Sequence, residues 1–310
     1  IGRKGQGLSP PISGGEESIF VRDTGNLKHG RTGEAVEAKH LSGAPVSVPA
    51  GDDPRAALAS WMTAPANPWF AKVMANRVWR ELMVQGIVEP VDDIRATNPA
   101  TNAALLEFLG NRFRQDGYDI KKLIKLVATS RTFALSSVPN DRNNGDLRNF
   151  SRYYRERLRA ETLLDAVNDI LAVEENFSAM PPGSRAVELW TFRASSLFLD
   201  TFGRPDPNQD PPCERTSDST TPQVLHLMNS PALNGKFAQE KARPAALAAS
   251  KESDEAIVET AYLLAYGRKP SDKERREALR GFPGAGKNRR QAVEDLFWAL
   301  LNTPEFVFID

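Results

Sequence analysis

The chain has 310 residues, long enough for one large domain or two modest ones with proper cores. Basic and acidic residues number 40 each, so the formal net charge is zero. Nucleic acid and anionic membrane surfaces are therefore poor partners, because both favour a basic excess. No apolar stretch approaches the roughly 20 residues of a membrane-spanning helix, and we expect no membrane span. The chain starts at Ile1 without a charged-then-apolar leader. We expect a mature or trimmed chain, with any export signal outside it.

Cysteine and histidine are scarce. Cys213 is the only cysteine in the sequence, which excludes an internal disulfide and covalent haem attachment through C-x-x-C-H and disfavours a structural zinc site. His226 and Met228 could be axial haem ligands, but residues two apart on one helix point in different directions. The other two histidines, His29 and His40, lie far away in the sequence. We expect no haem, no stoichiometric transition metal and no other cofactor.

Residues 1–52 are rich in Gly, Ser and Pro and contain short β-leaning pieces at 18–22, 33–41 and 45–49. They contain too few apolar residues to fold alone. The pattern predicts an extended arm or linker that is partly β, with a hairpin.

From Asp53 the pattern becomes helical. Asp53 with Pro54, and Asn67 with Pro68, are typical of helix starts. Ser271 and Glu274 form a capping box at a later helix. The sequence predicts a mainly α, multi-helix domain over 53–310, with a subdivision in the irregular, proline-rich stretch 172–220. The helices are expected at about 54–63, 68–84, 101–115, 120–130, 156–171, 221–229, 254–266, from 271 and at 289–302.

The 68–84 segment is apolar on most sides, with a polar row of Lys72, Asn76 and Arg80. Such a helix is central to its fold. Arg77 lies off the polar row, so we expect it to be largely buried and to need a carboxylate partner.

The turn after this helix reads EPVDDIRATNP at 89–99. One interpretation makes Glu89 with Asp92 or Asp93 a carboxylate pair for general acid and base catalysis, beside Arg95. The other makes the turn a structural corner in which carboxylates pair with arginines. We favour the corner and predict that Arg77 joins the helix to this turn. Removing one partner of a buried pair would cost about 3–5 kcal/mol.

Two further motifs are weak. Asp206, Asn208 and Asp210 could supply oxygen ligands to calcium, but Pro211 and Ser217 stand where a calcium loop has Gly and Glu. A solvated loop is the better interpretation. GAGK at 284–287 lacks the following hydroxyl and the preceding strand of a phosphate-binding loop.

The segment NPWFAKVMANRVWRELMVQGIVEPVDDIRATNPATN, together with SRTFALSS, LDTFGRP and DLFWALLNTPEFVF, resembles the planctomycete-type PSD-one domain family. The resemblance implies an exported, periplasmic or cell-surface protein in which this domain of unknown function lies C-terminal to a planctomycete-type cytochrome c domain. It implies no reaction. The family frequently has C-x-C before the Glu-Arg pair, whereas this chain has Pro211 and Cys213. A redox or disulfide role for that pair is therefore not expected.

Two functions from different classes follow. The first is a noncatalytic helical interaction module that contacts neighbouring domains or subunits, with a cytochrome c as candidate partner in extracytoplasmic electron transfer. The second is a hydrolase of an extracellular anionic glycan, which would use the acidic turn and an arginine cluster. Arginines in one open pocket would favour the hydrolase, and arginines paired separately with carboxylates would favour the module. The candidate cluster is Arg77, Arg131, Arg204 and Arg215, with Arg95.

Overall fold

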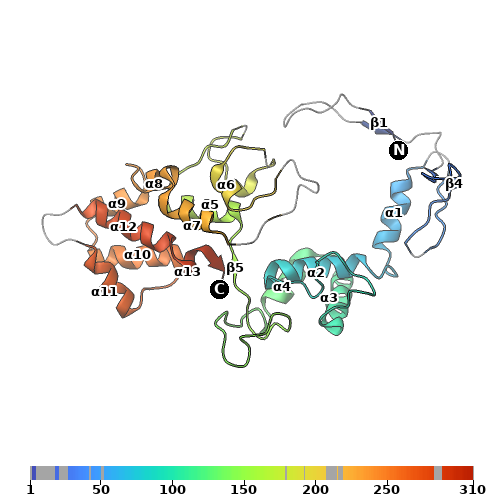
Figure 1. Ribbon diagram of the computed structural model, residues 1–310, viewed down its shortest axis with the longest axis horizontal. Coiled ribbons are helices and arrows are strands. Elements are labelled where there is room, and N and C mark those ends of the chain that lie inside the picture. The colour runs from blue at the N-terminus through green and yellow to red at the C-terminus, as the bar shows by residue number, and fades with distance from the viewer. Residues whose placement is uncertain are drawn as a thin grey trace. The chain divides into compact units, whose positions relative to one another are not determined.

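A computed structural model of the chain is shown in Figure 1. It describes residues 2–4, 18–20, 27–41, 43–49, 52–178, 180–191, 193–206, 215, 219–282 and 288–309. The chain forms two compact units, Ile1–Tyr154 and Arg155–Asp310, here called the N-terminal and C-terminal units. Each has its own hydrophobic core. The proline-rich stretch 172–220 lies inside the C-terminal unit.

The arm is made of short paired strands. β1 (Gly2–Lys4) pairs antiparallel with β2 (Ser18–Phe20), and β3 (Leu27–Lys28) pairs antiparallel with β4 (Ala35–Val36). An isolated bridge joins Lys39 to Pro45. None of the arm residues whose burial the structure describes is buried. The predicted extended, partly β character of the arm is therefore confirmed in the described residues.

The rest of the N-terminal unit is a small helical bundle. Its helices are α1 (Pro54–Thr63), α2 (Phe70–Met83), α3 (Ala103–Gln115) and α4 (Ile120–Ala128). Asp53, Asn102 and Asp119 cap α1, α3 and α4 by accepting a backbone N–H in the first turn. Helix α2 packs against both α3 and α4, as its apolar composition predicts, and Figure 1 shows the three together. No residue of α1 is buried.

One detail of the α2 prediction is wrong. Arg77 was expected to be largely buried, but its side chain is 53% exposed, whereas Asn76 of the polar row is fully buried. The physical reason is that the face of α2 that bears Asn76 covers backbone groups of the following loop. A neutral amide can satisfy such groups in the interior, whereas a guanidinium there would require its charge to be buried.

The C-terminal unit is also helical. Helix α12 packs against α8, α9, α10 and α13, while α5 packs against η1, α6 and α9. Strand β5 pairs antiparallel with β6, joining the two ends of the unit. Because Glu156 and Arg157 form this strand, α5 begins at Ala160 and not at 156 as predicted. The elements are β5 (Glu156–Arg157), α5 (Ala160–Leu171), the 3-10 helix η1 (Ala186–Glu188), α6 (Leu197–Thr201), α7 (Thr221–Asn229), α8 (Pro231–Phe237), α9 (Arg243–Ala249), α10 (Asp254–Tyr266), α11 (Asp272–Arg280), α12 (Arg289–Leu301), α13 (Pro304–Val307) and β6 (Phe308–Ile309).

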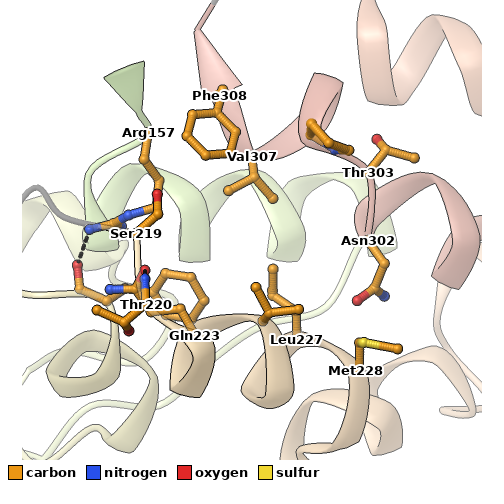
Figure 2. Close-up of a pocket in the computed structure, with 13 residues that line it drawn as sticks. Arg157, Ser219, Thr220, Gln223, Leu227, Met228, Asn302, Thr303, Val307 and Phe308 are labelled. Atoms are coloured by element: carbon orange, nitrogen blue, oxygen red, sulfur yellow. Dashed lines mark hydrogen bonds between the residues drawn. The ribbon is translucent and has the colours of Figure 1, made fainter. Parts of the chain in front are cut away.

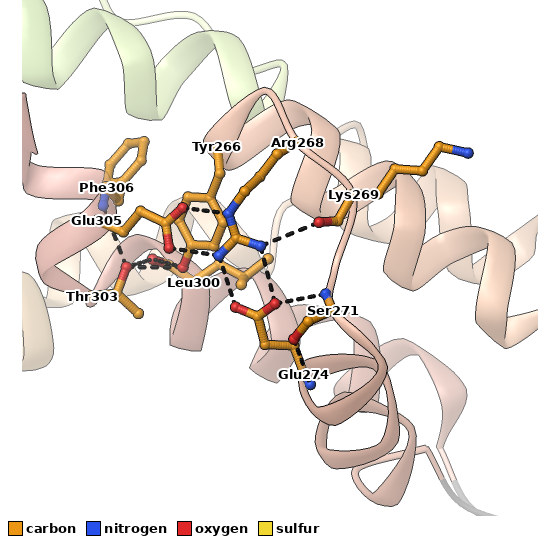
Figure 3. Close-up of polar contacts among 9 residues, drawn as sticks. All are labelled: Tyr266, Arg268, Lys269, Ser271, Glu274, Leu300, Thr303, Glu305 and Phe306. Carbon is orange, nitrogen blue, oxygen red and sulfur yellow. Dashed lines mark hydrogen bonds and ion pairs between the residues drawn. The ribbon is translucent and has the colours of Figure 1, made fainter. Parts of the chain in front are cut away.

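An ion-pair network around Arg268 fixes the connection between α10 and α11 (Figure 3). Its guanidinium binds both oxygens of Glu274, at 2.7 and 3.0 Å, and both oxygens of Glu305, at 2.7 and 2.8 Å. Glu274 also accepts the backbone N–H of Ser271, which completes the predicted capping box. The network ties the start of α11 to α13 and therefore stabilises one end of the unit.

The prediction of a mainly α fold is confirmed. After residue 52, the only strands in the described part of the chain are the two-residue β5 and β6. Among the helices that the structure describes, none has both the length and the apolar character that crossing a bilayer requires.

Candidate functional site

The acidic turn at 89–99 is held by the buried amide of Asn76. Its Nδ2 donates to the carbonyl oxygens of Val88 at 2.9 Å and Val91 at 2.8 Å, and its Oδ1 accepts the N–H of Val88 at 3.1 Å. From the other end, Thr101 donates its N–H and its hydroxyl to the carbonyl of Ile87. Side chains on both flanks therefore fix the path of this turn.

Each carboxylate of the turn has its own partner. Glu89 Oε1 accepts the N–H of Gly86 at 2.5 Å, and Asp93 Oδ1 lies 3.0 Å from Arg95 Nε. Asp92 receives two hydrogen bonds from Arg77, at 2.6 and 2.7 Å, and this guanidinium lowers the pKa of Asp92. The predicted pairing of Arg77 with the turn is confirmed. Both side chains are more than half exposed, however, so the pair contributes about 0–1 kcal/mol. The burial of the pair, on which the expected cost of about 3–5 kcal/mol rested, is therefore wrong.

The other candidate arginines are also dispersed. Arg131 is exposed after the end of α4. In the C-terminal unit, Arg204 pairs with Asp200 at 2.6 Å and Arg215 pairs with Glu161 at 2.7 Å. Within each unit, the paired arginines bind different carboxylates. Of the five candidate arginines, which include Arg95 of the turn, only Arg77 lines either of the two cavities described below.

The remaining motifs supply no assembled site in the described residues. Asp206 is exposed, while Asn208, Asp210, Cys213 and the GAGK motif lie outside the part of the chain that is described. Within the described ranges, no three His, Cys, Asp or Glu side chains are grouped so that they could hold a metal ion. His226 packs edge-on against Phe198 and Phe202, and burial lowers its pKa.

A cleft of about 620 Å³, here called the α1–α2 cleft, lies in the N-terminal unit. Helix α1 contributes an i, i+3, i+4 stripe of apolar side chains, and α2 contributes an i, i+3, i+4, i+7 stripe that ends in a charge. Three consecutive residues of the arm line one edge of the cleft. The lining residues are Leu58, Trp61 and Met62 from α1, Phe70, Val73, Met74 and Arg77 from α2, Asn67 and Trp69 from the connection, and Lys39, His40 and Leu41 from the arm.

Asn67 organises the connection between α1 and α2. It is 5% exposed, its Nδ2 donates to the carbonyl of Trp61, and its Oδ1 accepts the N–H groups of Trp69 and Phe70. The His40 ring stacks on Trp61, with centroids 4.9 Å apart and an interplanar angle of 11°. These contacts position the aromatic wall of the cleft. The predicted cap at Asn67 with Pro68 in the first helical position is wrong: Trp69 is the N-cap residue and α2 begins at Phe70, although Asn67 accepts the N–H groups of both.

The rim of the α1–α2 cleft exposes apolar groups to solvent. Leu41 is 83% exposed, Leu58 is 49% exposed and Met62 is 38% exposed. The charged groups among the described lining residues, Lys39 and Arg77, are both cationic. The sequence signal for this cleft was the apolar spacing in α1. The spacing alone does not predict the cleft, because an apolar stripe on a helix is usually buried by its neighbours. In the described residues of this unit, no residue of α1 is buried.

A smaller cavity of about 200 Å³, here called the α7 cavity, lies in the C-terminal unit (Figure 2). Helix α7 lines one side, and the turn before α13 and strand β6 line another. The guanidinium of Arg157 lies at one end of the labelled group. Sequence reasoning missed this cavity, because its walls come from separate parts of the chain: Arg157, Phe202, the 219–228 segment and the 302–308 segment.

Comparison with known proteins gives a family and no function. A family model named PSD1, described as "Protein of unknown function (DUF1553)", matches residues 54–282. No curated protein and no solved structure matches the chain.

Proposed function

The chain belongs to the PSD1 family of proteins of unknown function (DUF1553), and we propose that it is a noncatalytic helical interaction module of an exported multidomain protein. The α1–α2 cleft is its docking site. The occupant is a protein segment that places a large apolar side chain in the cleft and a carboxylate at its rim.

The observation that carries the proposal is the apolar stripe of α1, which the described residues cover only in part, through the His40 ring on Trp61. Leu58, Trp61 and Met62 share one side of a ten-residue helix in which no residue is buried. Helices in globular proteins normally bury such a stripe, because most of their stability comes from packing. An apolar surface left exposed and bordered by polar groups is typical of an interaction site.

The shape of the cleft favours a protein segment over a small molecule. Its volume of about 620 Å³ would accommodate either. A small molecule bound at the bottom of the cleft would leave the rim residues Leu41 and Leu58 exposed to water. A segment that lies across the cleft would bury floor and rim together, as amphipathic segments do in apolar grooves.

The charged residues that line the cleft indicate which charge its occupant carries. Lys39 and Arg77 are the charged residues among the described lining, and Arg77 already pairs with Asp92, so Lys39 is the cation that favours an anionic group at the rim. A carboxylate beside the apolar anchor would meet Lys39 at the rim. An occupant with basic residues at the same positions would be repelled.

The family resemblance supports a neighbouring domain of the parent protein as the source of this segment. A cytochrome c domain is the candidate, and the module would position it for extracytoplasmic electron transfer. The protein would then be periplasmic or located at the cell surface. The hydrolase alternative gains no support, because the acidic turn and the paired arginines of each unit form separate ion pairs.

The proposal is tested by isothermal titration calorimetry of the full chain with the adjoining domains of its parent protein, including the cytochrome c domain. We expect a saturable complex that Trp61→Ser weakens by about 30-fold, as removal of a central aromatic anchor does. Phe108→Ser is the matched control, because Phe108 is a 55% exposed aromatic residue on α3 outside the cleft. Equal effects of both variants, or no complex with any adjoining domain, would contradict the proposal. Self-association abolished by Trp61→Ser would assign the cleft to a second copy and contradict it as well.

A further inference from the structure

We propose that the segment bound in the α1–α2 cleft is proline-rich and extended, and that its backbone carbonyl oxygens accept hydrogen bonds from the indole N–H groups of Trp61 and Trp69. The inference rests on the docking function proposed above, because it concerns the same cleft. It adds the backbone conformation of the partner segment, which the docking function leaves open.

Two tryptophans form the aromatic wall of the cleft. Trp61 comes from α1 and Trp69 from the connection to α2, and their ring centroids are 6.2 Å apart with the planes tilted by 46°. The His40 ring is stacked on Trp61, while the Asn67 side chain hydrogen-bonds a backbone group of each tryptophan. These contacts position the two flat rings before a partner binds. Grooves lined by aromatic rings are typical of domains that bind proline-rich segments.

Both indole N–H groups are available as hydrogen-bond donors. No described residue accepts a hydrogen bond from the Nε1 atom of Trp61 or Trp69. The buried nitrogens without a partner in the described residues include Nε1 of Trp79 but neither of these two atoms, which therefore contact solvent. A segment that covers the wall would remove both N–H groups from water, and a buried indole N–H normally needs an acceptor. The occupant should therefore supply acceptors as well as apolar groups.

The need for acceptors separates three kinds of segment. An α-helix uses most of its carbonyl oxygens in its own hydrogen bonds, so it offers few along its length. A β-strand binds by pairing with the edge of a sheet, and a wall built on two helices has no such edge. A polyproline II segment has no internal hydrogen bonds, so its carbonyl oxygens are free to accept. It also loses little conformational entropy on binding, because proline fixes its backbone.

Polyproline II geometry also suits the two side chains that the docking function requires. It has three residues per turn, so side chains three positions apart lie along the same edge. An apolar residue on that edge would enter the cleft beside Phe70, and an acidic residue one turn away would approach the exposed Lys39. The inferred partner motif is therefore an apolar and an acidic residue, three positions apart, among prolines.

The experiment uses two synthetic peptides as probes of the full chain, which is labelled with nitrogen-15 in its tryptophan side chains. The first, acetyl-PPLPPEP-amide, carries a leucine and a glutamate three positions apart in a polyproline II segment. The second carries the same two side chains one turn apart in a hydrocarbon-stapled, alanine-rich helix. The chain has 5 tryptophans, so the indole region of the spectrum contains few signals.

We expect the proline-rich peptide to bind at least about 10-fold more tightly than the helical one, because its backbone accepts the two additional hydrogen bonds. It should move the indole proton signals of Trp61 and Trp69 downfield. The signals of Trp190 and Trp298, which lie in the C-terminal unit outside the cleft lining, should stay unchanged.

A conservative variant separates the hydrogen bond from the ring. Trp69→Phe keeps an aromatic ring and removes the N–H group, so it should weaken the proline-rich peptide by about 5-fold, as expected for one neutral hydrogen bond. Trp190→Phe is the matched control, because Trp190 is 56% exposed and does not line the cleft. It should leave the affinity unchanged. Equal affinities of the two variants would contradict the proposed hydrogen bond.

Three further results would overturn the inference. They are the absence of binding by the proline-rich peptide, equal or tighter binding of the helical peptide, and binding that leaves both indole signals unshifted. The docking function would survive each of them if calorimetry still showed a complex with an adjoining domain that Trp61→Ser weakens. Absence of that complex would contradict the docking function itself, so the two failures are distinguishable.

Discussion

The side-chain amide of Asn76 hydrogen-bonds both backbone groups of Val88, accepting its N–H at 3.1 Å and donating to its carbonyl at 2.9 Å. The amide thus makes the same two hydrogen bonds to Val88 that a neighbouring β-strand residue would make, and it links a buried helix to a loop. It sets the path of the acidic turn from the inside, while the Arg77–Asp92 pair lies on the surface. The conformation of the turn therefore depends on a neutral amide more than on its charges.

Asn76→Ala should lower the free energy of unfolding of the N-terminal unit by about 2–4 kcal/mol, because it leaves buried backbone groups of Val88 and Val91 unsatisfied. Arg77→Ala should cost about 0–1 kcal/mol, as is typical of an exposed ion pair. Urea denaturation of both variants provides the measurement. A larger loss for Arg77→Ala would show that the ion pair dominates.

Gly86→Ala should destabilise the same turn. A Cβ atom at this position would lie 2.4 Å from the carbonyl oxygen of Val88, a backbone atom that is itself held by Asn76. The cost should be about 1–3 kcal/mol, as for other overpacked sites. Gly145→Ala is the control, because an added Cβ meets nothing within 4 Å there. Thermal unfolding of the two variants should separate them, and equal melting temperatures would refute the steric argument.

Acidification should weaken the Arg268 network. The hydrogen bonds from Arg268 lower the pKa of Glu274 from 4.5 to about 2. Because the folded state binds this proton less tightly than the unfolded state, the stabilisation is complete above pH 4.5 and is lost as the pH falls toward 2. We expect the difference in melting temperature between wild type and Glu274→Gln to be largest above pH 5 and to shrink on acidification.

Glu277→Gln is the control for this titration, since Glu277 lies on the same helix in an exposed pair with Arg280. Its effect should be small throughout the range. A Glu274→Gln difference that stayed constant down to pH 2 would mean that the carboxylate does not stabilise the fold through Arg268.

Charge at the cleft rim should control how fast the partner associates. Lys39→Glu replaces a cationic lining residue by an acidic one, so it should slow association several-fold at low salt, with a smaller effect at high salt. Lys28→Glu makes the same charge change at an exposed arm residue outside the cleft lining. Association rates measured by stopped flow should distinguish the two variants. Identical rates would argue against an anionic occupant.

The fold was largely predictable from the sequence because its helices carry local signals. The caps at Asp53 and Asp119 and the capping box at Ser271 each require only the residue and its own helix start. The short helices α6, α8, α9 and α13 lack a sustained apolar period, so they were not predicted. Ser196, Ser230 and Thr303 cap α6, α8 and α13, but such caps do not reveal helices this short. All four helices also pack against α5 or α12, which the sequence does not show.

The candidate sites were less predictable, because solvent exposure is a tertiary property. The sequence correctly predicted that Arg77 pairs with the acidic turn. It predicted burial of Arg77, whereas Asn76 is the buried polar residue of α2, because apolar neighbours do not reveal which polar side chain faces a loop. The α7 cavity combines Arg157, Gln223 and Phe308, which lie far apart in the sequence. No local pattern brings such residues together.

The central claim, that the α1–α2 cleft is a docking site for an adjoining domain, is tested most directly by the methionine methyl spectrum of the full chain during titration with that domain. Met62 and Met74 line the cleft, while Met83 is fully buried in the core of the same unit and provides an internal reference. We expect saturable shifts of Met62 and Met74 with Met83 unchanged, and loss of these shifts in Trp61→Ser. Binding that leaves Met62 and Met74 unshifted would contradict the claim.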